Sequence, residues 1–117
     1  MIVLLTTLAH AAPIATWSFD ANNGLFVHGG DPDLWEWGTP GSEPGSCFGG
    51  SGACWCTGLD SDYGTDSYDT LTFASYDLTA IADPRLTLAH WYDIDPGGDW
   101  GELQYDDVNG ETGRELL

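Results

Sequence analysis

Three cysteines, Cys47, Cys54 and Cys56, lie close together beside a glycine-rich stretch. In an exported chain this predicts one disulfide and one remaining thiol, which is either buried or cross-linked to another chain. We favour Cys47–Cys54, which would close the glycine-rich loop and restrict the unfolded chain, with Cys47–Cys56 second. Cys54 and Cys56 lie along one strand, which is poor disulfide geometry. Zinc bound with His28 or His90 is an alternative, although the spacing is not CxxC.

A second group of candidate residues consists of carboxylates around a Pro-Gly-Gly turn, Asp93, Asp95, Asp99 and Glu102. Carboxylate oxygens are the ligands that Ca²⁺ takes, but the spacing is not that of an EF-hand. In β-sandwiches a cation often ties such a turn to the first strand, where Asp20 is the natural partner. These five residues are the predicted calcium ligands, and a solvated turn is the alternative.

Six tryptophans are many for a chain of this length. Exposed aromatic rings stack on the apolar faces of sugars, so Trp35, Trp37, Tyr63 and Trp100 are candidate glycan-binding residues. Trp100 and Tyr63 are the rings expected to be most exposed, and most of the other tryptophans are expected in the core. His90, in a central strand, is expected to be packed in the core rather than to be a ligand.

The chain shows no constellation that predicts catalysis. Glycosidases use two carboxylates across a groove. Of the acidic residues only Glu36, between two tryptophans, is expected in buried surroundings. Nothing supports a nucleophile–base pair beyond the presence of the residue types. We therefore expect no enzyme activity.

The formal net charge of the 117-residue chain is -17, with Arg85 and Arg114 as its fixed positive charges. Such a surface repels phosphate backbones and anionic lipid headgroups, which excludes nucleic-acid binding and binding to a membrane surface. Most of the nineteen acidic residues are expected to be solvated.

The first residues resemble a secretory signal peptide. An apolar run, Ile2–Leu8, precedes the small-x-small pattern Ala9-His10-Ala11. The predicted organisation is a signal peptide over residues 1–11 and one domain over 12–117, secreted or at the cell surface. The run is too short to cross a membrane. An N-terminal β-strand is the alternative for this segment.

The remaining elements are expected to be short strands, because sixteen glycines and six prolines suit tight turns and no segment has a sustained helical period. The central element is a hairpin whose first strand, Leu86–Tyr92, has two apolar faces and whose return strand buries Leu103 and Tyr105. His28–Asp33 is expected to be a loop and Asn109-Gly110 a hairpin turn. The other expected strands are Thr16–Phe19, Leu25–Val27, Leu34–Trp37, Ala53–Leu59 and Thr70–Leu78.

The order of several motifs resembles that of MAM-like, jelly-roll modules of bacterial secreted proteins, found beside peptidases of the immune-inhibitor-A type. The matching residues are Phe19-Asp20, Gly24-Leu25-Phe26, Trp35-Glu-Trp-Gly-Thr-Pro40, Cys54-Trp-Cys-Thr-Gly-Leu59 with Tyr63, Tyr76-Asp-Leu-Thr79 and Leu86–Asp93. Cys56 stands where a small residue is typical, and the strands after the acidic turn are mostly absent.

The resemblance implies an all-β, two-layer antiparallel sandwich that is incomplete at its C-terminus or completed by another chain. It also implies a non-catalytic extracellular module for adhesion or glycan binding, often with calcium, whose partner is a glycan or a protein. A structural spacer in a larger surface or secreted protein is the first alternative. A fragment of a jelly-roll glycoside hydrolase is the second.

Overall fold

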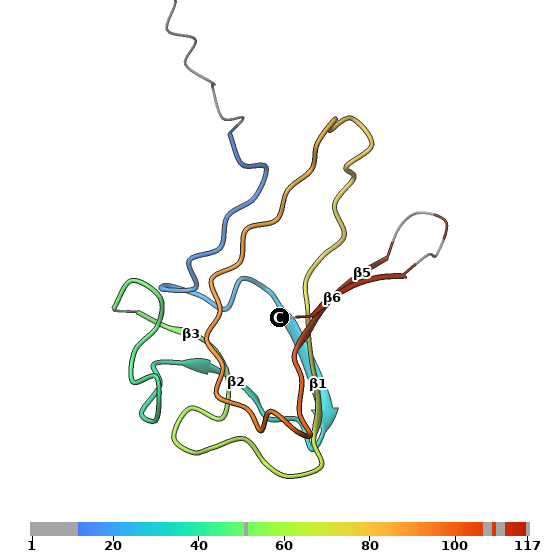
Figure 1. Cartoon of the computed structure of the whole chain (residues 1–117). Helices are drawn as coiled ribbons and strands as arrows, with labels where there is room; N and C mark the ends of the chain where they lie inside the picture. Colours follow the sequence, from blue (N-terminus) through green and yellow to red (C-terminus); the bar gives the residue numbers. More distant parts are fainter. Residues whose placement is uncertain (1–11, 51, 107–108, 110–111, 117) are drawn as a thin grey trace, which may run out of the picture. The chain divides into compact units, whose positions relative to one another are not determined.

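The computed structural model describes residues 12–50, 52–106, 109 and 112–116 (Figure 1). In this part of the chain every regular element is a β-strand, and the strands form three antiparallel pairs. The same residues include no helix with the length and apolar character needed to cross a membrane. The all-β class is therefore confirmed. The proposed signal peptide, residues 1–11, lies outside the described residues.

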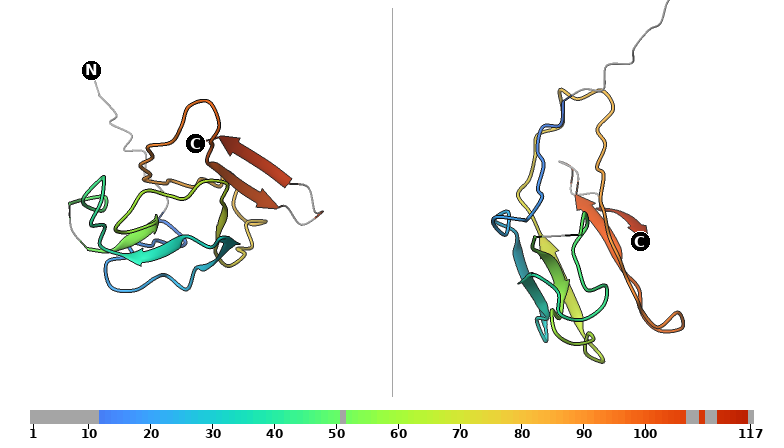
Figure 2. Two further views of the ribbon diagram at one scale, coloured as in Figure 1. Left: turned by 90° about the horizontal axis from the view of Figure 1, so that it is seen from below. Right: turned by 90° about the vertical axis from the view of Figure 1, so that its left-hand side faces the viewer.

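The chain divides into two compact units, unit 1 through Leu86 and unit 2 from Thr87. Unit 1 contains β1 (Val27–Asp31), β2 (Trp35–Gly38), β3 (Cys54–Thr57) and β4 (Tyr68–Thr72), and β1 pairs with β4 while β2 pairs with β3. In the left view of Figure 2 the teal β2 and the green β3 run side by side. The two pairs are separate ladders.

Leu34 connects the two strand pairs of unit 1 through its backbone. Its amide donates to Asp69 Oδ1 on β4 at 2.7 Å, and its carbonyl accepts from the amide of Gly58, just after β3, at 3.0 Å. Because both bonds use the main chain, they do not depend on the apolar side chain of Leu34. This residue therefore holds β2–β3 against β1–β4 by polar contacts.

An aromatic cluster forms the main apolar contact of unit 1. The Trp17 ring lies 5.4 Å from Phe26, 5.3 Å from Phe73 and 5.8 Å from Tyr76, measured between ring centroids, and Phe19 lies 5.1 Å from Phe26. Edge-on and tilted arrangements of this kind are the ones that aromatic quadrupoles favour. The cluster joins the N-terminal segment to the chain that follows β4.

Several strand assignments in unit 1 are corrected. Of the expected strand Leu25–Val27 only Val27 lies in a strand, and the expected strand Thr70–Leu78 ends at Thr72. Residues 16–19 form no strand, because Phe19 adopts φ 63°, a left-handed conformation that interrupts an extended run. Most of the expected loop His28–Asp33 lies in β1. A Cβ on Gly30 would come within 2.7 Å of the Tyr68 carbonyl oxygen, so the glycine that looked like a loop residue allows close strand approach.

Unit 2 contains one hairpin, β5 (Glu102–Asp106) paired with β6 (Thr112–Leu116), drawn in red in Figure 1. The second strand of the expected central hairpin is therefore present, as β5. It pairs with β6, which follows it in the chain, and not with the residues before the acidic turn. The expected strand Leu86–Tyr92 is wrong: these residues form no ladder among the described residues. Gly110, of the expected turn at Asn109-Gly110, lies outside the described residues.

Burial is low throughout the described chain. Cys47, 7% exposed, and Pro40 are its buried residues. Leu86, expected inside a sheet, is 53% exposed, and Tyr105 is exposed as well, although its ring lies over Gly113 on the opposite strand. An aromatic ring over a cross-strand glycine is a known stabilising pair. The described residues do not show two closed sandwich layers.

Candidate functional site

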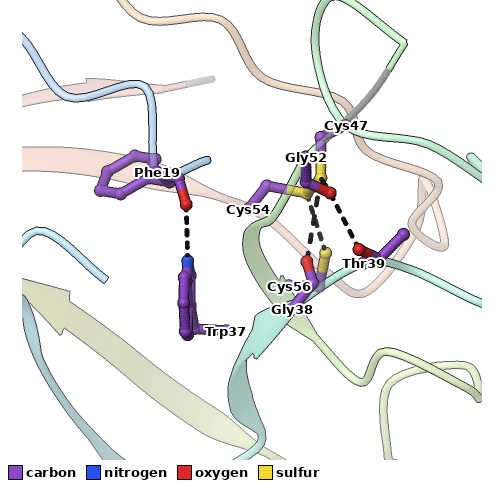
Figure 3. The surroundings of a disulfide bond; sticks show 8 residues. All are labelled: Phe19, Trp37, Gly38, Thr39, Cys47, Gly52, Cys54 and Cys56. Atoms are coloured by element: carbon purple, nitrogen blue, oxygen red, sulfur yellow. Dashed lines mark hydrogen bonds between the residues drawn. A yellow bond between two sulfur atoms is a disulfide. The ribbon is translucent and has the colours of Figure 1, made fainter. Parts of the chain in front are cut away.

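The Cys47–Cys54 disulfide is present, with the two Cα atoms 5.7 Å apart, and this prediction is confirmed (Figure 3). It joins the glycine-rich loop to the first residue of β3. Cys47 Sγ lies 3.8 Å from the Gly38 carbonyl oxygen and 3.7 Å from that of Gly52. A disulfide sulfur carries no hydrogen, so in this state these are close contacts and not hydrogen bonds.

The loop around the disulfide is held by a further side chain. Thr39 Oγ1 donates to the Gly52 carbonyl oxygen at 2.9 Å (Figure 3). The carboxylate of Asp20 also lies against Gly52, at the place where a Cβ would project. Asp20 is therefore a neighbour of the loop in unit 1. The other four predicted calcium ligands belong to unit 2.

Cys56 carries the one free thiol in the described part of the chain. Residues two apart on a strand share a face, and Cys56 Sγ lies 3.8 Å from Cys54 Sγ. Partial burial raises the pKa of the Cys56 thiol, and the carboxylate of Glu36, its cross-strand partner on β2, raises it further. The thiolate is the reactive form, so this environment keeps the thiol protonated near neutral pH.

Three sulfurs thus meet at the β3 end of the loop. Zinc would need several free thiolates, and the disulfide already uses two of the three cysteines. His28, one of the histidines considered for zinc, places Nδ1 2.8 Å from Asp33 Oδ2 and its ring 5.2 Å from that of Trp55. The zinc alternative is therefore not supported by this arrangement.

Glu36 does not occupy the buried surroundings expected for a catalytic acid. It is exposed, and its Oε2 accepts a hydrogen bond from the Leu59 amide at 2.8 Å. Its clearest effect is on its neighbour, the Cys56 thiol.

The candidate glycan-binding rings of unit 1 differ in what they contact. Trp37 Nε1 donates to the Phe19 carbonyl oxygen at 3.0 Å (Figure 3). Trp35 Nε1 is buried and has no acceptor among the described residues, and Tyr63 is half-buried rather than exposed. These rings are consequently used, at least in part, for packing within unit 1.

Among the four candidate glycan-binding rings, the one that belongs to unit 2 is the most exposed. Trp100 is 71% exposed, as expected, and Trp91, Tyr92 and Tyr105 each expose more than half of their surface. His90 stacks on Tyr92, with centroids 5.6 Å apart and ring planes 13° from parallel, and is exposed rather than packed in a core. The apolar pattern of residues 86–92 indicated burial, so sequence reasoning missed Trp91 and Tyr92 as surface rings.

The acidic turn of unit 2 is organised by Asp95. Its Oδ1 accepts from the Gly97 amide at 3.1 Å, and its carbonyl oxygen accepts from the amides of Gly98 at 3.2 Å and Asp99 at 3.1 Å. An aspartate that bonds its own backbone two residues ahead is a common turn-forming device. The carboxylate of this predicted ligand therefore already has a structural use.

Glu102 is engaged on both carboxylate oxygens. Gln104 Nε2 donates to Oε1, and Arg114 Nη1 lies 3.8 Å from Oε2. Across the described residues no three His, Cys, Asp or Glu side chains gather as a metal-holding group. Calcium binding by Asp93, Asp95, Asp99 and Glu102 remains a prediction.

The chain matches no protein-family model, and neither a curated protein nor a solved structure matches it. The similarity to MAM-like modules thus rests on the motifs of the sequence.

Proposed function

We propose that this protein is a non-catalytic extracellular binding module that recognises a glycan or a protein surface through aromatic rings of unit 2. The observation that carries the proposal is the exposure of Trp91, Tyr92, Trp100 and Tyr105 in one small unit. Large rings in water are costly unless a partner covers them, and a flat ring complements the apolar face of a sugar.

The net charge of the chain limits the kinds of partner that can bind. With a net charge of -17, a neutral glycan or a basic protein surface is compatible with close approach, whereas polyanions are repelled. Trp100 is the ring chosen for the test, because it is the most exposed of the four.

The test compares wild-type protein with Trp100→Ala and with Phe48→Ala in titration calorimetry against a panel of neutral polysaccharides and oligosaccharides. Phe48, 89% exposed in unit 1, is the matched control. One ring face covers on the order of 80 Å², worth about 2 kcal/mol, so Trp100→Ala should weaken binding roughly thirtyfold. Phe48→Ala should leave the Kd unchanged. Equal losses in both variants would contradict the assignment of binding to the rings of unit 2. No binding to any glycan or basic protein tested would favour the spacer alternative.

The proposal includes a calcium ion that stabilises the acidic turn of unit 2. Asp93, Asp95, Asp99 and Glu102 would supply oxygen ligands, and the ion would have to replace the Gly97 amide at Asp95 and the Arg114 guanidinium at Glu102. Thermal melts with added Ca²⁺ and with a chelator test this: an ion that binds the folded state raises the Tm, and the rise grows with the logarithm of its concentration above the Kd. Identical melting curves would remove the ion from the proposal.

A further inference from the structure

We propose that the three sulfurs form an internal thiol–disulfide exchange site, in which Cys56 attacks Cys54 and releases Cys47. The observation is geometric. The free thiol sulfur of Cys56 lies 3.8 Å from Cys54 Sγ, one of the two sulfurs of the Cys47–Cys54 disulfide (Figure 3). Exchange proceeds by attack of a thiolate on a disulfide sulfur, and here both groups are held on one strand.

The reaction balances without an external oxidant or reductant. The Cys56 thiol loses its proton to solvent, and its sulfur electron pair forms a bond to Cys54 Sγ. The Cys47–Cys54 bond breaks with its electron pair on Cys47, which takes up a proton. The products are a Cys54–Cys56 disulfide and a Cys47 thiol, so the number of disulfides is unchanged.

The product disulfide is within reach of strand geometry. A strand rises about 3.3 Å per residue, which separates Cα atoms two residues apart by roughly 6.6 Å, near the upper limit of the range seen for disulfides. The sequence pattern alone made this pairing unfavourable. The structure changes that assessment, because the two side chains already point together and the sulfurs are in contact.

The thiol that exchange would release, on Cys47, lies next to two hydrogen-bond acceptors. Cys47 is 7% exposed, and the carbonyl oxygens of Gly38 and Gly52 lie 3.8 and 3.7 Å from its sulfur. Once Cys47 carries a hydrogen, either oxygen can accept it, at distances suited to a sulfur donor. Exchange therefore moves the free thiol from half-buried Cys56 to a buried position with two hydrogen-bond acceptors.

The local electrostatics set the conditions for the reaction. Partial burial and Glu36 raise the pKa of Cys56, so the thiolate is scarce at neutral pH and exchange should be slow there. Below that pKa the thiolate fraction rises about tenfold with each pH unit, and the exchange rate should rise with it.

The experiment incubates the oxidised, full-length protein without reductant over a pH series, quenches it in acid, labels free thiols with N-ethylmaleimide and maps unreduced peptides by mass spectrometry. Chymotrypsin cleaves after Trp55, which separates Cys54 from Cys56. The expected result is a fraction of molecules with the label on Cys47 and a Cys54–Cys56 link, appearing faster at higher pH. Cys56→Ser should leave Cys47 unlabelled at every pH.

Two outcomes of this incubation overturn the proposal. One is label on Cys56 alone at every pH, and the other is a Cys47–Cys56 link with label on Cys54. A second variant examines the product directly. Cys47→Ser, treated with oxidised glutathione as the oxidant, should form Cys54–Cys56 within one chain and release reduced glutathione. A stable mixed disulfide with glutathione, without ring closure, would show that the sulfurs cannot join.

Discussion

The two units of this chain contrast in how they use aromatic and polar groups. Unit 1 gathers Trp17 and its neighbouring rings into a cluster and adds a disulfide, two strand pairs and the backbone bonds of Leu34. Unit 2 has one hairpin and leaves Trp91 and Trp100 in solvent. A two-stranded hairpin by itself is marginally stable. Tryptophan therefore adds packing to unit 1, through Trp17, and adds little to unit 2, where Trp91 and Trp100 face solvent.

The largest expected effect comes from removing the covalent link of unit 1. Replacing Cys47 and Cys54 together by alanine frees the loop in the unfolded chain as well as in the folded one. Loop-closure entropy for a link of sequence separation 7 corresponds to about 2–3 kcal/mol of unfolding free energy. Urea denaturation followed by tryptophan fluorescence measures the loss. Cys56→Ala is the matched control and should shift the unfolding free energy by less than about 0.5 kcal/mol.

A pair of tryptophan variants tests whether aromatic rings stabilise unit 1 more than unit 2. Trp17→Ala removes three ring contacts and should lower the unfolding free energy of unit 1 by about 2 kcal/mol, less than for a fully buried ring because the cluster is partly exposed. Trp100→Ala should change stability by less than about 0.5 kcal/mol. Equal losses would mean that Trp100 packs as Trp17 does, and the contrast between the units would disappear.

A smaller effect concerns reactivity rather than stability. Glu36→Gln keeps an acceptor for the Leu59 amide but removes the negative charge opposite Cys56. The pKa of Cys56 should fall toward its ordinary value without reaching it, because burial is the larger cause of the shift. Iodoacetamide should then label Cys56 a few-fold faster at pH 8. Glu102→Gln, in unit 2, should leave the labelling rate unchanged, and an unaltered rate in Glu36→Gln would contradict the assignment.

The smallest effect is an acid titration in the part of unit 1 that has no strands. Thr79 donates to Asp77 Oδ1 through its hydroxyl at 2.7 Å and its amide at 3.0 Å, and these bonds lower the pKa of Asp77. A lowered pKa stabilises the fold above the ordinary aspartate value of about 4, and that contribution is lost as the pH falls through the lower value. Asp77→Asn should therefore flatten the pH dependence of stability below about pH 4. Chemical denaturation at several acidic pH values measures it, and an unchanged slope would exclude the contribution.

Local sequence signals predicted the class of fold and the disulfide, because both depend on neighbouring residues. Glycines and prolines at short intervals favour strands joined by turns, and Cys47 and Cys54 are close enough along the chain to close a small loop. The strand at Trp35–Gly38 was also predictable, since its alternating tryptophans have a two-residue period.

Contacts between distant segments decided the rest. The apolar pattern of Leu86–Tyr92 is compatible with a strand, but a strand needs a hydrogen-bonding neighbour, and no ladder in the described chain includes it. Gly30 looked like a loop residue until the close approach of Tyr68 showed why a side chain is excluded there. The contact between the sulfurs of Cys54 and Cys56 depends on side-chain rotamers, which spacing along the chain does not specify.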